Sequence, residues 1–257
     1  MAKFFARTVL LAVSAALALT ACSTSGSVMP TAPTSSSVQA GQSILTGGTA
    51  IRPADFPDTA KITNPYLPYV PGTKYLFTGK LGKAPEKDVQ FVTFKTRKIA
   101  GINCVIVLDL GYVSGRLEER TQDYYAQDFY GNVWYFGEYE TSYHPRSHKS
   151  SWLAGVNGAS PGIVMEATPR VGDQYYQENA PGVAEDQARV ISLTQNVRTP
   201  FGSFFGNVLE TKEFSKLEPG VIDHKYYEPG YGLMEDDVVR GGREILKLTG
   251  IIVNHKH

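Results

Sequence analysis

The chain has 257 residues, and its 25 Lys and Arg side chains balance 25 Asp and Glu side chains. Nucleic-acid binding and attraction to anionic lipid headgroups both rely on a basic excess, so this composition argues against either kind of partner. Nearly 200 residues follow position 59, which is ample for one well-packed domain.

The N-terminus has the pattern of an export signal. Lys3 and Arg7 precede an uncharged run at residues 8–21, TVLLAVSAALALTA. This run is too short to span a bilayer as a helix, and its length is typical of the apolar core of a signal peptide. We therefore predict a signal peptide over residues 1–21.

The end of that run resembles a lipobox, because Leu19-Thr20-Ala21 stands directly before Cys22. In lipoproteins the thiol at this position takes the lipid, so Cys22 is predicted to be acylated and to anchor the chain to a membrane. By resemblance to Gram-negative lipoproteins, a non-aspartate at Ser23 indicates the outer membrane, facing the periplasm. The alternatives are a one-membrane host, or an ordinary secretory signal in which Cys22 is incidental.

Residues 22–59 are dominated by Ser, Thr, Gly and Pro, with few apolar side chains. Such a segment cannot offset its ordering entropy by burial, so we expect a disordered, flexible linker. It would connect the lipid to a single β-rich domain over residues 60–257.

Short runs rich in Val, Ile, Tyr, Phe and Thr alternate with Gly and Pro turns after residue 60, which predicts strands and hairpins. No window shows a convincing helical stripe. We therefore expect an all-β antiparallel meander that closes into a barrel or a strongly curved half-barrel, and residues 141–162 are expected to form a long irregular loop. The predicted strands are 74–80, 87–99, 102–113, 117–129, 133–139, 163–167, 174–178, 184–197, 203–214, 221–227, 233–239 and 244–253.

The second cysteine, Cys104, lies in an apolar run and is expected to be a buried hydrophobe. The five histidines are not joined by Cys or carboxylates in a recognisable ligand pattern. We therefore expect neither a metal site nor a cofactor.

Aromatic residues are concentrated between positions 123 and 152. Tyr125, Trp134, Phe136 and Trp152 are candidates for a stacking site that binds an amphipathic or carbohydrate ligand, with the long loop as a lid. The alternative is cross-strand pairing that only stabilises a hairpin.

Carboxylates are interleaved with these aromatics. Strand alternation places Glu119, Asp123 and Tyr125 on one face, so a barrel with that face inward would have an acidic interior. Two such groups with separated pKa values could perform acid/base hydrolysis, whereas solvent exposure or pairing with arginines would give them no catalytic role. The candidate acids and bases are Glu119, Asp123, Asp128, Glu138, Glu185 and Asp186.

Several long strings resemble a group of bacterial secreted proteins and lipoproteins. They include DYYAQD at 123–128, GNVWYFGE at 131–138, SWLAGVNG at 151–158 and PGI at 161–163. The resemblance extends from about Ile62 to Leu248 and implies an envelope location and a β-rich fold. The group has no established activity, so it implies no catalytic residue.

Three functions remain open at this point. The first is an envelope lipoprotein that binds a small amphipathic ligand or an envelope partner without catalysis. The second is a carboxylate-dependent hydrolase acting on envelope polysaccharide. The third is a structural envelope protein, which an exposed apolar patch would favour.

Overall fold

The fold was analysed in a computed structural model that describes residues 44–45 and 51–254. In the described part of the chain nearly all regular structure is β-strand, and the one helix is a short 3-10 turn, η1 (Pro53–Asp55). The all-β prediction is confirmed. Within the same residues, no helix is both long enough and apolar enough to cross a membrane.

All strands belong to one sheet, and every pairing in it is antiparallel except that of β1 with β9. Apart from β7, which pairs only with β6, the order across the sheet is β1-β9-β11-β12-β13-β14-β15-β2-β3-β4-β5-β6-β8-β10. The strands are β1 (Ile44–Leu45), β2 (Thr73–Leu81), β3 (Ala84–Ile99), β4 (Ile102–Val113), β5 (Arg116–Gln127), β6 (Val133–Ser142), β7 (His148–Leu153), β8 (Ser160–Met165), β9 (Gln174–Tyr176), β10 (Glu178–Asn179), β11 (Asp186–Arg198), β12 (Ser203–Ser215), β13 (Ile222–Glu228), β14 (Gly232–Arg240) and β15 (Glu244–Val253).

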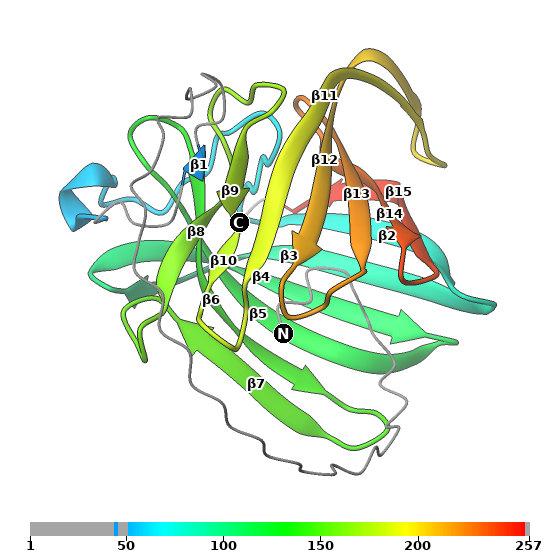
Figure 1. The fold of residues 1–257 in the computed structure, drawn as a ribbon, viewed down its shortest axis with the longest axis horizontal. Helices are drawn as coiled ribbons and strands as arrows, with labels where there is room; N and C mark the ends of the chain where they lie inside the picture. Colours follow the sequence, from blue (N-terminus) through cyan, green and yellow to red (C-terminus); the bar gives the residue numbers. More distant parts are fainter. Residues whose placement is uncertain (1–43, 46–50, 255–257) are drawn as a thin grey trace, which may run out of the picture.

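The sheet nearly closes on itself through one short stretch of chain. β9 pairs with β11, and β10, one residue further on, pairs with β8 at the other end of the sheet. Gln177 between them donates its backbone N–H to the carbonyl of Asp186 at 2.8 Å. The strands therefore curve around a common interior (Figure 1), as a meander of this length is expected to do.

Tight hairpins connect several pairs of consecutive strands, among them β3 with β4 and β4 with β5. Ala100-Gly101 and Ser114-Gly115 have positive φ at both positions and form the two-residue turns before β4 and β5. This conformation matches the right-handed twist of the flanking strands. Eleven of the twelve predicted strands each match one strand, and the predicted strand 174–178 is divided at Gln177 into β9 and β10. The expected irregular loop at 141–162 is wrong, because it contains β7, whose polar and largely exposed sequence HKSSWL gives no apolar pattern.

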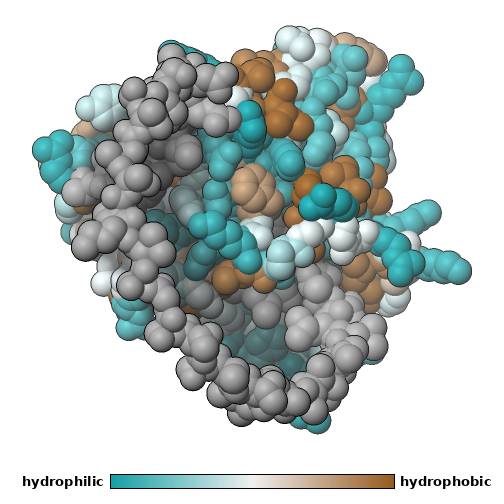
Figure 2. All heavy atoms as spheres, viewed as in Figure 1, coloured by the Kyte–Doolittle hydropathy of each residue, from teal (hydrophilic) through white to brown (hydrophobic). Residues whose placement is uncertain are grey.

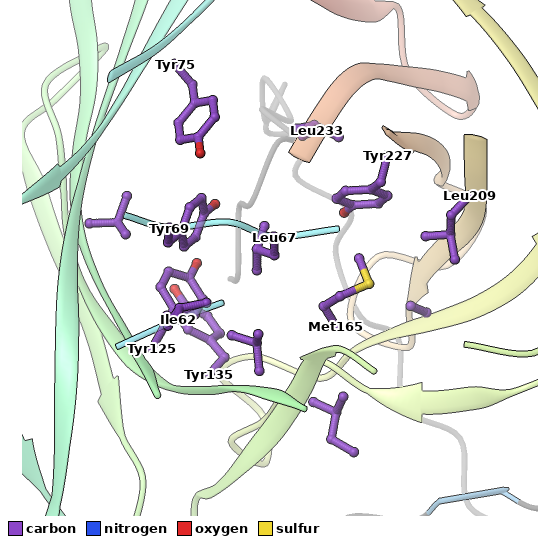
Figure 3. Packing of buried hydrophobic residues seen from close by; sticks show 14 of the residues in the cluster. Ile62, Leu67, Tyr69, Tyr75, Tyr125, Tyr135, Met165, Leu209, Tyr227 and Leu233 are labelled. Carbon is purple, nitrogen blue, oxygen red and sulfur yellow. The ribbon is translucent and has the colours of Figure 1, made fainter. Parts of the chain in front are cut away.

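The interior is filled in part by a non-strand segment, residues 61–72. Its side chains Ile62, Leu67 and Tyr69 are buried in the main hydrophobic cluster. In Figure 3 this segment crosses between Tyr125 and Tyr135 on one side and Leu209 and Tyr227 on the other. The barrel is therefore a packed body rather than an open channel at this level.

Asn64 fixes that segment by satisfying backbone groups. Its Nδ2 donates to the carbonyls of Gly131 and Glu166 at 3.0 and 2.9 Å, and its Oδ1 accepts from Tyr66 N at 2.9 Å. The Gln127 side chain accepts from the backbone of residues 63 and 64. Because buried backbone groups need partners, one polar side chain inside the barrel makes this irregular path possible.

A second, outer cluster lies on the opposite face of the sheet. It contains Phe56, Ile99, Ile102, Cys104, Tyr124, Ala126, Phe136 and Ala154. Phe56 meets Phe136 edge to face with ring centroids 5.5 Å apart. Residues 51–58, which the sequence assigns to the linker, contact the barrel, and Phe56 among them is buried. Residues 1–43 and 46–50, which include the predicted signal peptide and Cys22, lie outside the described residues.

Candidate functional site

The inward face of the sheet changes from apolar to acidic along the strands. On β15, every second residue from Leu248 back to Glu244 is buried, and the series Leu248, Leu246, Glu244 ends in an acid. On β5, the buried Tyr125 and Asp123 are likewise two residues apart. Because alternate residues of a strand share a face, these acids point into the interior. Further buried acids on neighbouring strands are Glu86, Asp88, Glu138, Glu140, Glu178, Glu213, Asp223 and Asp236.

A β-bulge brings one tyrosine between two of these acids. The register of β5 with β6 shifts between the pairs Asp123–Glu138 and Tyr125–Tyr135, where Gly137 has a φ of 127°. The extra residue allows Tyr135 and Glu138, three positions apart, to point inward together. A Cβ at Gly137 would lie 2.2 Å from a backbone oxygen of β7, so this position requires glycine.

The Tyr135 hydroxyl lies 2.7 Å from Asp123 Oδ1 and 3.1 Å from Glu138 Oε2. A phenol has one proton, so it donates to only one carboxylate, and the second carboxyl must be protonated to donate in return. Burial, reinforced by Glu140, raises the pKa of Glu138 to about 8. Burial also raises the pKa of Asp123 well above its ordinary value. The geometry and the direction of the shifts agree that this group holds protons near neutral pH.

A small inner cavity of about 50 Å³ adjoins this group. Of the described residues that line it, five are acidic and one is basic. The acids are Glu178, Asp186, Glu213, Glu218 and Asp223, and the base is Lys225. The apolar part of the lining comes from residues such as Leu67, Val164, Tyr227 and Leu233.

Lys225 on β13 is buried and forms an ion pair with Glu213 on β12, with Nζ 2.5 Å from Oε2. The other carboxylate oxygen of Glu213 accepts from Thr211 Oγ1 at 2.9 Å and Gln177 Nε2 at 3.1 Å. Burial by itself lowers the pKa of Lys225, but Glu213 and Asp236 outweigh it and raise the pKa above its ordinary value. Lys225 is therefore a permanent cation inside the barrel.

Lys225 also stabilises the charged forms of Asp186 and Asp223, but it does not act in this way on Glu178. Glu178 is 2% exposed, and neither of its carboxylate oxygens has a hydrogen-bond partner among the described residues. Burial, with Asp186 and Glu138 nearby, raises its pKa well above the ordinary value. Burial likewise raises the pKa of Asp186 to about 7 and that of Asp223 to about 6. Clustered shifts of this kind mark functional sites more often than ordinary structural ones.

A larger vestibule of about 600 Å³ lies outside the inner cavity. Glu218 and Val221 line both spaces, so the two adjoin. The vestibule is formed between β6–β7 on one side and the loops before β11 and β13 on the other. Its lining residues are Glu140, His148, Lys149, Ser150, Gly182, Val183, Leu217, Glu218, Pro219 and Val221. The larger space therefore lies beside a small one whose lining is rich in carboxylates.

Within residues 44–45 and 51–254, no group of three or more His, Cys, Asp or Glu side chains is placed to hold a metal ion.

The four predicted aromatic site residues do not form one exposed platform. Tyr125 and Trp152 are buried in the main cluster, where Tyr125 stacks on Tyr135 at 4.8 Å and Trp152 meets Tyr135 edge to face at 5.4 Å. Phe136 lies in the outer cluster on the other side of the sheet. Trp134 is half-buried and belongs to the packing of both clusters. The structure therefore brings Tyr125 and Trp152 together and separates Phe136 from them.

Two of the six predicted carboxylates have local structural contacts. Asp128 accepts from Trp134 Nε1 at 2.8 Å and from the backbone of Tyr130 and Asn132, which closes the β5–β6 hairpin. Glu185 accepts from Gly182 N at 2.8 Å within a turn. Both side chains satisfy backbone donors, which is a common use of acids in turns.

The remaining four predicted carboxylates point into the interior. Asp123 and Glu138 share the Tyr135 hydroxyl, and Asp186 lines the inner cavity. Glu119 is half-buried and accepts from Thr121 Oγ1 at 3.3 Å. The sequence did not single out Lys225, Glu213, Asp223 or Asp236. For Asp223 and Lys225 a signal is present, because they occupy alternate positions of IDHKYYE (β13). Asp236 stands in a run of three acids on β14, and Glu213 lies on β12.

Some large aromatic side chains are exposed at hairpin ends rather than at the cavity. Phe129 and Tyr130 lie in the turn after β5, and Phe205 lies near the start of β12 beneath the Arg198 guanidinium. On the face shown in Figure 2, hydrophobic patches are interspersed among hydrophilic residues. Such scattered exposure is normal for a folded domain and defines no site by itself.

Comparisons with known proteins give little further information. No protein-family model matches the chain, and no curated protein has a significant match to it. Among solved structures, the chain is similar to a "putative lipoprotein" from Parabacteroides distasonis, with 10% identity and a TM-score of 0.40. The match covers 76% of this chain and 100% of that one. A similarity of this size supports no functional argument.

Proposed function

We propose that the protein is a lipid-anchored protein of the cell envelope that binds a small amphipathic ligand at the vestibule and inner cavity. The signal-like N-terminus that ends at Cys22 supports the anchor. The residue after it, Ser23, supports an outer-membrane location facing the periplasm. The long motifs between residues 123 and 163 support kinship with bacterial secreted proteins and lipoproteins.

One observation carries the ligand-binding part of the proposal: the vestibule and the inner cavity adjoin and differ in size. The vestibule, at about 600 Å³, is within the usual range of about 300–1,000 Å³ for small-molecule sites. The inner cavity, at about 50 Å³, admits only a small polar group. An amphipathic molecule would fit this shape with its polar end inside and its apolar part against Val183, Leu217 and Pro219.

The other functions have less support. A saccharide ring does not fit a cavity of about 50 Å³, so the inner carboxylates do not flank a space for a glycosidic bond. Asp123 and Glu138 are fully enclosed by the barrel. A structural or partner-binding role rests only on the exposed aromatics at the hairpin ends.

The binding proposal is tested with N-phenyl-1-naphthylamine, an uncharged probe that fluoresces in apolar sites, on the full-length Cys22→Ser chain. We expect saturable fluorescence that is weakened about tenfold by the double replacement Val183→Ser and Leu217→Ser, because both side chains line the vestibule. Val171→Ser, which changes an exposed valine elsewhere, is the matched control. Absence of saturable binding, or equal binding by both variants, would contradict the proposal.

The anchor is tested by growing cells with an alkyne-tagged palmitate and measuring its incorporation into the full chain. We expect labelling of the native chain and none of Cys22→Ser, since the only other cysteine, Cys104, is buried in the outer cluster. Unchanged labelling after Cys22→Ser would reject acylation at this position.

A further inference from the structure

The described side chains that line the inner cavity have an uneven charge. Five of them are carboxylates and one is an ammonium. Burying several like charges close together is costly unless they are protonated or paired with cations. The structure shows both situations in neighbouring parts of the same cavity.

At β12–β14 the counter-charge is built into the chain. The Lys225 ammonium pairs with Glu213 at 2.5 Å, and Asp223 and Asp236 also act on it electrostatically. A primary ammonium therefore pairs directly with a buried carboxylate in this barrel. The chain itself demonstrates which chemical group this acidic interior accommodates.

At β10–β11 no such cation is present among the described residues that line the cavity. Glu178 is almost fully buried, faces the cavity, and has no hydrogen-bond partner for either carboxylate oxygen among the described residues. The carboxyls of Asp186 and Glu138 add to its electrostatic cost. An unpartnered buried carboxylate at a cavity that adjoins a vestibule favours a ligand that donates hydrogen bonds and carries positive charge.

We infer that the ligand is an organic amine, with its ammonium group at Glu178 and Asp186 in the inner cavity and its apolar part in the vestibule. This inference rests on the proposed function and specifies its ligand class. An ammonium group is close in size to a water molecule, whose share of liquid volume is about 30 Å³. It therefore fits the cavity of about 50 Å³, whereas an alkyl chain does not and extends into the vestibule.

Three probes of equal length separate charge from apolar binding: octylamine, octanol and octanoate. Their affinities for the full-length Cys22→Ser chain are measured at pH 7 by ligand-observed NMR titration. We expect octylamine to bind at least about tenfold more tightly than octanol, and octanoate to bind most weakly. A tenfold preference corresponds to about 1.4 kcal/mol, a modest value for one buried charge-assisted contact.

Substitutions then locate the head group. Glu178→Gln and Asp186→Asn should each weaken octylamine at least about fivefold and leave octanol unchanged. Asp58→Asn, which neutralises an exposed acid outside the cavity, is the matched control. Far-ultraviolet circular dichroism checks that each variant is folded.

Each outcome decides a different claim. If no probe binds, the proposed function itself fails. If octanol or octanoate binds as tightly as octylamine, the proposed function stands and the amine inference is overturned. If octylamine is preferred but neither Glu178→Gln nor Asp186→Asn weakens it, the assigned position of the ammonium is wrong.

Discussion

Replacing Glu138 by Gln should stabilise the folded chain at neutral pH and have little effect in acid. Glu138 is 2% exposed and lies 3.1 Å from the Tyr135 hydroxyl, which also lies 2.7 Å from Asp123. Burial favours the neutral, protonated form of the Glu138 carboxyl. A glutamine amide is also neutral and can also donate, so it reproduces the protonated state.

The magnitude follows from the pKa of Glu138, which burial raises from an ordinary 4.5 to about 8. Between these pH values the folded state holds a proton that the unfolded state has lost, so stability falls as pH rises. At about 1.4 kcal/mol for each pKa unit, the wild-type chain loses about 3 kcal/mol through this group by pH 7 and nearly 5 kcal/mol above pH 8. Glu138→Gln does not undergo this loss.

The measurement is denaturant unfolding of the full-length chain from pH 4.5 to 8.5 at constant ionic strength. The free energy of unfolding of Glu138→Gln minus that of wild type should rise from near zero to about 3 kcal/mol at pH 7. Asp58→Asn, at an exposed position, should show no such rise. A difference that stays constant across this range, or that falls with pH, would refute the reasoning that Glu138 is protonated in the fold.

Three further substitutions or reactions test the framework around the site. Asn64→Ala should lower the free energy of unfolding by about 3 kcal/mol, because it strips partners from several backbone groups; a loss under about 1 kcal/mol in denaturant titration would contradict this. Gly137→Ala should lower the melting temperature far more than Gly115→Ala. Both glycines have a positive φ, but only at Gly137 would the added Cβ lie within 4 Å of backbone atoms. Burial raises the pKa of Cys104 to about 12, so in the Cys22→Ser chain a maleimide should label it only after denaturation.

The strand pattern was predictable because it depends on local signals. Alternating side chains and paired turn residues such as Ser114-Gly115 are visible in the sequence itself. β7 was not predictable in this way, because it is stabilised by pairing with β6 and only Trp152 is buried along it. An edge strand with polar residues on most positions carries no periodic signal.

The candidate site was predictable only in part, for a geometric reason. Strand alternation correctly groups Asp123 with Tyr125 on the inward face, but it places Tyr135 and Glu138 on opposite faces. The bulge at Gly137 reverses that expectation, and nothing in the alternation indicates it. The partners of Lys225 lie on different strands, so the cavity exists only once the register of β12 to β14 is fixed. Sequence patterns give the face of each residue within a strand and not its neighbours across the barrel.

The interior acids are best explained by binding rather than by folding. The same strands pack Tyr125, Leu246 and Leu248 a few positions away, so the geometry of the barrel accepts apolar side chains on its inner face. Replacing buried charges with apolar residues of similar size is often neutral or stabilising, so stability alone would not maintain unpaired carboxylates such as Glu178 and Asp236. Residues that oppose the stability of a fold are expected at functional sites. The acidic half of the interior, beside the vestibule, is therefore the part of the molecule in which a positively charged ligand would make the largest difference to stability.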